Sequence, residues 1–215
     1  MLLPCDAEGL AAFDTFGLAI RTVSGGGTHC AILFDLVGGE PCLLHLAWNY
    51  RLEAEPVGPP YGWVEVGLQP SNRKLMAIMA DRVWRRRPGI PYGLSKLGLS
   101  FDALTGDLRR GPLGRGLTCA SFILAVFAAG GFTLLMEEAW PENANDAWQQ
   151  WVVDKLKDTG APQEQVDAVM QDIGARRFRP VEVVASSTLP AEDCWPVPFD
   201  VAQALGAKLE GELAA

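Results

Sequence analysis

The sequence predicts an α+β fold, in which an antiparallel sheet meander packs on a central buried helix and a helical C-terminal lobe follows. Three observations predict it: apolar runs broken by Gly- and Pro-rich turns over residues 16–68, an uncharged run that starts near Cys119, and amphipathic helical patterns after Pro141. The chain of 215 residues is 49% hydrophobic and 20% charged, which is enough apolar material for one sizeable core.

Four strands are expected in the first third of the chain. Residues 16–23, 28–37 and 41–52 are extended apolar runs joined by short turns, which is typical of an antiparallel meander. A Pro- and Gly-rich loop over 55–60 leads to a fourth strand at 62–68. We therefore expect strands that follow one another in the sequence to be neighbours in the sheet.

Helices are expected in most of the remaining chain. Ser71 is the expected N-cap of a helix that ends before Pro88, and the stretch after it is irregular apart from a short hairpin at 104–108. The expected helices cover residues 71–86, the buried run from Cys119, 144–158, 162–174 and 199–210. Because no repeat or linker divides the chain, we expect a core of residues 1–140 with residues 141–215 packed on it as a helical extension.

The charge balance and the cysteine content bear on partners and location. The net charge is −8 and the sequence pI is about 4.8, so nucleic acid is not expected as a partner, because phosphate binding needs clustered Lys and Arg. The one basic run, at 85–87, is interpreted as a solvated helix end. Five cysteines without a framework spacing, and no secretory signal at the start, predict free thiols and a cytoplasmic location.

One stretch approaches the length of a membrane span. Residues 117–136 contain no charge over 20 positions, near the length that crosses a bilayer. Gly130 and Gly131 interrupt the run after about three turns, and hydroxyl side chains break its apolar surface. We therefore expect a buried helix, a short extended piece at 132–136, and no membrane span.

A cysteine stands at the entry of this buried helix. Gly114 and Gly116 precede it, and Thr118 is the expected N-cap, whose hydroxyl can accept from an amide of the first turn. Cys119 then lies in the first turn, where the backbone N–H groups and the helix dipole favour a thiolate, the nucleophilic form. The alternative is a structural cysteine at the edge of a core helix.

A cysteine nucleophile needs a base, usually histidine, which the fold brings close. The chain has two histidines: His29 at the start of a strand and His45 within an apolar strand. We assign His45 as the base and Glu65, on the next predicted strand, as its partner, since a carboxylate among Trp and Val side chains needs one. Asn49 and Gln69 are further candidates for this third role. The alternatives are a hydrogen-bonded core histidine for His45 and a solvent-facing position for Glu65.

The order of these residues resembles the circularly permuted NlpC/P60-like branch of the papain-like cysteine hydrolases, which includes the lecithin:retinol acyltransferase-like enzymes. The first motif of that branch is similar to H-W-A-I-Y, and residues 45–50 read H-L-A-W-N-Y. Its second histidine ends the next strand in a run like Y-V-V-H-L, and residues 62–66 read G-W-V-E-V. Its cysteine motif is similar to N-C-E-x-F-V, and residues 118–123 read T-C-A-S-F-I. The resemblance covers residues 16–130.

The resemblance implies a papain-like core over residues 1–140, with Cys119 as nucleophile, His45 as base and Glu65 in the place of the second histidine. It implies a cysteine peptidase or amidase that attacks an amide, peptide or ester carbonyl and forms an acyl-thioester, without a cofactor. Glutamate in that place fits the wider superfamily, in which the third polar residue varies. The missing N-C-E signature argues against lipid acyl transfer in particular.

A metal site is the first alternative function. Its candidate zinc ligands are His29, Cys30, Cys42 and His45, with Cys194 or Cys5 needed to complete a set. Because side chains alternate along a strand, at most one residue of each strand can converge on a metal. We therefore expect no metal.

Other functions stay open at the level of the sequence. A non-catalytic papain-like module could bind partners through a groove lined by tryptophans, of which Trp140, Trp148 and Trp151 cluster near the first C-terminal helix. An acyltransferase or a toxin could use the same cysteine–histidine pair. The sequence does not predict the oligomeric state or the bond that is cleaved.

Overall fold

The structure is a computed structural model, which describes residues 2–25, 27–35, 39–142 and 147–214. Its fold is α+β, as the sequence predicts. The main sheet is antiparallel, with the order β1-β6-β2-β3-β4-β5. Its described strands are β1 (Leu3–Pro4), β2 (Phe16–Val23), β3 (Gly27–Phe34), β4 (Cys42–Trp48), β5 (Arg51–Pro56) and β6 (Gly62–Glu65).

Strands β2 to β5 form the expected meander, but the third expected strand is in fact a hairpin. The run 41–52 turns at Asn49 and Tyr50, and Tyr50 has a φ of 58°, a left-handed conformation that reverses the chain. The chain then returns as β5, so Glu55 lies in a strand and not in the expected loop. After β5 the chain crosses to the opposite end of the strand order, where β6 pairs with β2 and not with β4, the strand that carries His45.

The helices differ from the expected ones mainly at their ends. Pro70 is the first residue of the first helix, one residue before the expected cap Ser71, and the fourth helix ends at Met170. The described helices are α1 (Pro70–Arg86), α2 (Cys119–Ala129), α3 (Ala147–Asp158), α4 (Gln163–Met170), α5 (Pro180–Ser186), α6 (Ala191–Cys194) and α7 (Phe199–Leu213), with 3-10 turns η1 (Gly9–Ala12) and η2 (Glu137–Ala139). The start of the third expected helix, 144–146, lies outside the described residues. The small hairpin is present as β7 (Ser100–Phe101) and β8 (Leu108–Arg109).

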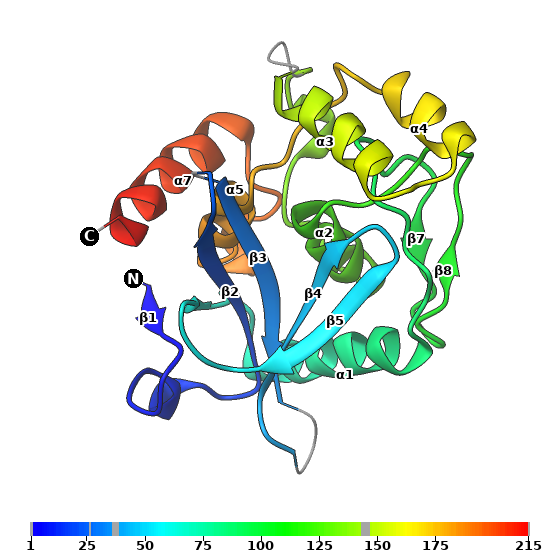
Figure 1. Ribbon diagram of the computed structural model, residues 1–215. Coiled ribbons are helices and arrows are strands. Elements are labelled where there is room, and N and C mark those ends of the chain that lie inside the picture. Colours follow the sequence, from blue (N-terminus) through cyan, green and yellow to red (C-terminus); the bar gives the residue numbers. More distant parts are fainter. Residues whose placement is uncertain (1, 26, 36–38, 143–146, 215) are drawn as a thin grey trace.

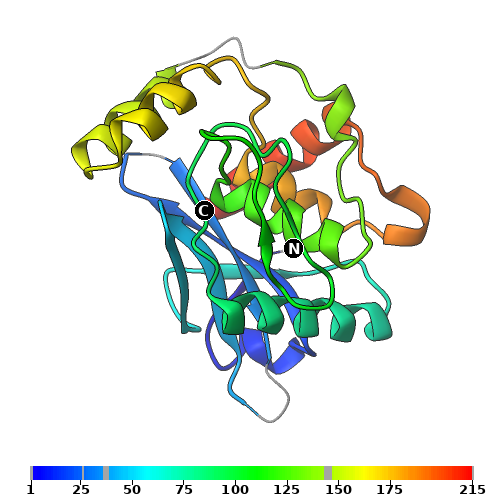
Figure 2. The same ribbon diagram turned by 90° about the vertical axis from the view of Figure 1, so that its right-hand side faces the viewer.

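The main core lies between one face of the sheet and the helices α1, α2 and α5 (Figures 1 and 2). Helix α2 is buried from Cys119 to Phe127, as predicted, and the side chains of Phe122 and Phe127 have no exposed surface. The piece 132–136 is not a strand, and its Leu135 makes only a single bridge with Val197. No helix among the described residues is both long enough and apolar enough to span a bilayer.

The sheet opens between β3 and β4. Their pairing runs from Phe34 opposite Cys42 to Ile32 opposite Leu44 and stops there, while β3 stays paired with β2 as far as Gly27. The two strands diverge beyond this point, as Figure 1 shows. The divergence leaves a gap in the sheet beside the first turn of α2, and the polar residues described below meet in this gap.

Candidate functional site

Cys119 is the first residue of α2, and a capping box holds it there. The Thr118 hydroxyl accepts a hydrogen bond from the Ser121 backbone N–H at 3.2 Å, and the Ser121 hydroxyl oxygen accepts one from the Thr118 N–H at 2.8 Å. The predicted N-cap is therefore confirmed. As the first residue of α2, Cys119 lies at the positive end of the helix. Its side chain is 7% exposed and lines a cavity.

The Cys119 sulfur has three polar neighbours, all from the start of β3. The Cys30 thiol, the His29 imidazole and the Cys30 backbone N–H are the groups near the sulfur that act on its protonation. The hydrogen bond with the Cys30 thiol, the positive charge and hydrogen bond of His29, and the Cys30 N–H lower the pKa of Cys119 well below its usual value, although burial acts in the opposite direction. The pKa of Cys30 is raised by burial and by this neighbour, so Cys30 keeps its proton.

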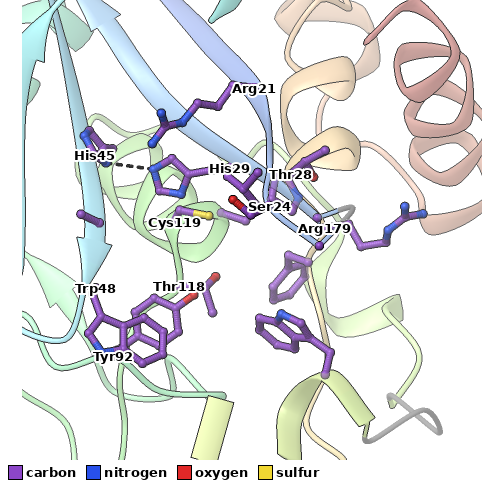
Figure 3. Close-up of a pocket in the computed structure, with 18 of the residues that line it drawn as sticks. Arg21, Ser24, Thr28, His29, His45, Trp48, Tyr92, Thr118, Cys119 and Arg179 are labelled. Carbon is purple, nitrogen blue, oxygen red and sulfur yellow. Dashed lines mark hydrogen bonds between the residues drawn. The ribbon is translucent and has the colours of Figure 1, made fainter. Parts of the chain in front are cut away.

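Behind Cys119 a chain of polar side chains runs across the gap. His29 Nε2 lies 2.9 Å from His45 Nδ1 (Figure 3). His45 Nε2 lies 3.2 Å from Glu55 Oε1. The second pair of atoms is close but does not form a hydrogen bond, and neither atom has another hydrogen-bond partner among the described residues. Since Nε2 of His29 faces His45, its Nδ1 is the nitrogen left for the Cys119 sulfur.

His45 is held in its neutral form. It is only 3% exposed, and burial, followed by the charge of His29, lowers its pKa, against the opposing effect of Glu55 and Glu53. Arg21, which faces His29 across the β2–β3 pair, adds to this effect. A neutral His45 with a proton on Nε2 presents an acceptor at Nδ1, so it can take a hydrogen bond from a protonated His29.

The structure does not bring Glu65 to His45. Strands β2 and β3 separate β6 from β4, and the exposed Glu65 side chain forms an ion pair with Arg73. The predicted role of Glu65 is therefore wrong in its geometry, and Glu55 occupies that position instead. Asn49 is not a partner either: its side-chain oxygen accepts from the Tyr92 backbone N–H at 2.9 Å and thereby fixes a loop.

Two further assignments change with this geometry. Gln69 occupies the N-cap position of α1. Among the described residues, no hydrogen bond joins Gln69 to either histidine. His45 contacts His29 and is one residue removed from Cys119, so it is not the direct neighbour of the sulfur that its predicted role as base requires. His29, which the sequence analysis left without a catalytic role, is the direct neighbour of the sulfur.

The position of Glu55 beside His45 follows from the register of the β4–β5 hairpin. A turn at Asn49 and Tyr50 sets His45 opposite Glu53 in the hairpin, and this leaves Glu55 on the same face, diagonally across from the imidazole. The sequence signal is the Glu-x-Glu alternation at 53–55 after an Asn-containing turn. His29 has no such local signal, because its approach to Cys119 depends on the packing of α2 against the sheet.

The site opens into a cavity of about 800 Å³, a size suited to a small molecule or a few residues of a chain. Aromatic side chains line it on the side away from the histidines. The Trp48 ring lies 4.4 Å from the ring of Tyr92 and 6.0 Å from that of Trp151 (centroid distances), and Trp148 is part of the same wall. Figure 3 shows Trp48 and Tyr92 below the sulfur, and His45, His29 and Arg21 above it.

Comparisons with known proteins find no family model that matches the chain, and no similar curated protein or solved structure. Within the described residues, no group of three or more His, Cys, Asp or Glu side chains is arranged to hold a metal ion. Function is therefore argued from the chemistry of the side chains. A cysteine with a lowered pKa, an imidazole beside it and a buried relay behind that imidazole are the parts of a nucleophilic site.

Proposed function

We propose that this protein is a cysteine hydrolase that attacks an amide, peptide or ester carbonyl with Cys119 and forms an acyl-thioester. This proposal is based on the His29 imidazole near Cys119. The line of polar side chains continues from His29 to His45 and Glu55. Transfer of the acyl group to an amine or alcohol would use the same intermediate. A buried thiol–imidazole contact of this kind has a chemical use, whereas a core of apolar side chains alone would be simpler to stabilise.

His29 is the base in this proposal. It takes the Cys119 proton on Nδ1 and becomes an imidazolium, which donates from Nε2 to the Nδ1 of neutral His45. His45 in turn directs its Nε2 proton toward the Glu55 carboxylate. This line of side chains therefore stabilises the positive charge of His29 and fixes the orientation of both rings, while His45 itself stays neutral.

The reaction then proceeds in two steps. The thiolate adds to the carbonyl carbon, and the oxyanion accepts from the Cys119 backbone N–H, which has no acceptor within the helix. His29 gives its proton to the leaving group, and the acyl-thioester remains. Water, activated by His29, then adds to the thioester, and the free thiolate leaves with the acid as product. Tyr92 lines the same cavity and, because burial raises its pKa, keeps its proton and is a neutral O–H donor there.

Within the proposed family relationship, the two histidine positions are assigned to other residues than the sequence suggested. The permuted papain-like branch has two histidines before its cysteine, and His29, His45 and Cys119 follow that order. In this assignment His29, and not His45, stands in the place of the first histidine, and His45 replaces Glu65 in the place of the second. The cysteine at a helix start against a sheet agrees with such a fold, and the family relationship remains part of the proposal.

Acylation by a p-nitrophenyl ester tests the proposal directly. We expect a burst of p-nitrophenol equal to the amount of protein, with the acyl group found on Cys119 by intact-mass and peptide mass spectrometry. The Cys119→Ala variant should give no burst, while Cys42→Ala, at a half-buried cysteine outside the site, is the matched control and should behave as the wild type. A non-catalytic binding module would give no acyl adduct on Cys119 in any of these proteins, and that result would refute the hydrolase.

A further inference from the structure

The cleft beside Cys119 consists of two hollows that meet. The cavity of about 800 Å³ continues into a second one of about 430 Å³, and both are lined by Thr118, Trp148, Arg177 and Phe178. The second hollow lies on the other side of the first turn of α2, among residues 94–99 and Ser121. An elongated substrate can therefore cross the start of α2 with parts on both sides of the sulfur.

Arg177 is fixed at this junction. Its backbone carbonyl accepts a hydrogen bond from Trp140 Nε1 at 3.1 Å, and the Trp140 ring is buried against Phe178 and Phe199. Its guanidinium carbon lies 4.2 Å from the centre of the Trp148 ring, in a cation–π contact. Backbone and side chain are thus both held at the edge of the cleft.

Among the described residues, the guanidinium of Arg177 forms no ion pair with a carboxylate. Over residues 2–25, 27–35, 39–142 and 147–214, no side chain accepts a hydrogen bond from its guanidinium and no acidic group forms an ion pair with it. Glu182, whose charge acts on Arg177 without forming an ion pair, caps α5 through the Arg179 N–H at 3.0 Å, and Glu210 pairs with the Arg179 side chain. Glu142 lines the second hollow together with Arg177. A half-buried guanidinium that contacts an aromatic ring but forms no ion pair within the described part of the chain is unusual in a protein of net charge −8.

We propose that Arg177 binds a carboxylate of the substrate next to the scissile carbonyl, so that the cleft selects an extended peptide or isopeptide with an acidic residue at that position. The inference rests on the proposed function, because it places the carboxylate relative to the sulfur that reacts. The segment that supplies Arg177 lies outside the region of family resemblance. The C-terminal lobe would therefore select the substrate for a site built by the first two thirds of the chain.

The surroundings of Arg177 favour a carboxylate on a peptide over a phosphate or a lipid chain. One guanidinium offers a two-bonded match to one carboxylate, whereas phosphate sites usually combine several donors. The second hollow is lined by polar as well as apolar side chains, including Ser95, Gln149 and a Lys96–Glu137 ion pair of 2.8 Å. Such a lining suits a peptide backbone better than an acyl chain.

Two alkylating reagents that differ only in charge test this inference on Cys119. Iodoacetate and iodoacetamide both transfer a CH₂ group to the thiolate with loss of iodide, but only iodoacetate carries a carboxylate beside the carbon that is attacked. We expect Arg177→Gln to lower the iodoacetate-to-iodoacetamide rate ratio at Cys119 roughly three- to tenfold, the range of a partly screened charge interaction. The iodoacetamide rate itself should stay the same, which also reports an intact site.

Matched variants make the outcome specific. Arg179→Gln removes a guanidinium that pairs with Glu210 and extends away from Cys119 in Figure 3, so the ratio should not change. Arg177→Lys should keep part of the ratio, because it keeps the charge without the two-bonded geometry. An equal ratio in the wild type and Arg177→Gln, or a fall that occurs in Arg21→Gln instead, would overturn the inference.

A substrate pair extends the test to turnover. We expect a fluorogenic peptide with glutamate before the scissile bond to exceed its glutamine counterpart in kcat/KM about tenfold or more, with the preference lost in Arg177→Gln. Equal turnover of the two peptides by the wild type would refute the acidic specificity and leave the hydrolase intact. Failure of Cys119 to react with either alkylating reagent would refute the hydrolase itself, so the two failures are distinguishable.

Discussion

The two walls of the cleft differ in composition and in how they are built. The wall at the sheet is a line of polar groups, His29, His45 and Glu55, which follow one another across the gap between β3 and β4. The wall at the C-terminal lobe includes Trp148 and Arg177, which contact each other, and Arg177 forms no ion pair with any carboxylate of the described residues. The polar groups of the sheet wall can orient the reactive sulfur, whereas the Arg177 guanidinium at the lobe wall is available to bind a ligand.

This contrast separates reactivity from selection. Variants at the sheet wall should change the reactivity of Cys119 toward every reagent, while variants at the lobe wall should change only the response to charge. Along the line of His29, His45 and Glu55, the effect of a substitution should decrease with each step away from the sulfur.

The largest effect is expected for His29→Ala. In the wild type the pKa of Cys119 is lowered, so its thiolate persists as the pH falls from 8 to 6, whereas an ordinary cysteine with a pKa of about 8.5 loses roughly tenfold in reactivity for each pH unit. Without the imidazolium the pKa of Cys119 rises and its alkylation profile shifts to higher pH. Turnover should fall about 10²- to 10⁴-fold, because the general acid and base is gone.

The measurement is iodoacetamide alkylation of each cysteine across this pH range, followed by peptide mass spectrometry. The other cysteines of the same protein serve as internal controls; the pKa of Cys42 is raised to about 11 by burial, followed by nearby carboxylates, so it should react slowly at all these values. A Cys119 profile that is unchanged in His29→Ala would show that His29 does not act on the sulfur, and would remove the basis of the sheet wall.

A smaller effect is expected for His45→Ala, which removes the acceptor for the outer nitrogen of His29. We expect a loss of about 10- to 100-fold in turnover, as for other residues that orient a reactive side chain. Because the pKa of His45 is lowered, its neutral form persists below its usual pKa, and acid that protonates it removes the acceptor at Nδ1. The acid limb of the wild-type pH–rate profile should therefore change shape in this variant, and an unchanged profile would contradict the relay.

Cys30→Ala tests the thiol that faces Cys119. Loss of this hydrogen bond should raise the pKa of Cys119 and reduce its alkylation rate at neutral pH severalfold. Since Cys30 has no exposed surface, its truncation should also lower the free energy of unfolding by about 1 kcal/mol. Denaturant unfolding separates the two effects, because Cys5→Ala, at another buried cysteine, should affect stability but not the Cys119 profile.

The smallest effect is expected for Glu55→Gln, at the outer end of the relay. Its contact with His45 is poorly aligned and its side chain is 40% exposed, so we expect a loss of less than tenfold in turnover. Glu65→Gln is the matched control on the far side of β2 and β3 and should leave turnover unchanged. A larger loss in Glu65→Gln than in Glu55→Gln would reverse the assignment of the third residue.

Much of the fold and one residue of the site could be predicted from consecutive residues. The α+β class, the buried helix α2 and the capping of Cys119 by Thr118 follow from short patterns of hydrophobicity and hydrogen-bonding side chains. These features depend on neighbours within a few positions, so the sequence contains the information in readable form. The sequence also predicts that both histidines lie on strands, but it does not predict which of them lies next to the Cys119 sulfur.

Only the tertiary structure decided the partners of Cys119. The choice of Glu55 over Glu65 depends on a reversal at Tyr50 and on the crossing of β6 to the opposite side of the sheet, and neither follows from the alternation of apolar residues. The choice of His29 over His45 depends on where β3 and β4 part and α2 enters. Such contacts join residues up to 90 positions apart, His29 to Cys119, and they are set by strand pairing and packing, whose free energies are shared over the whole core.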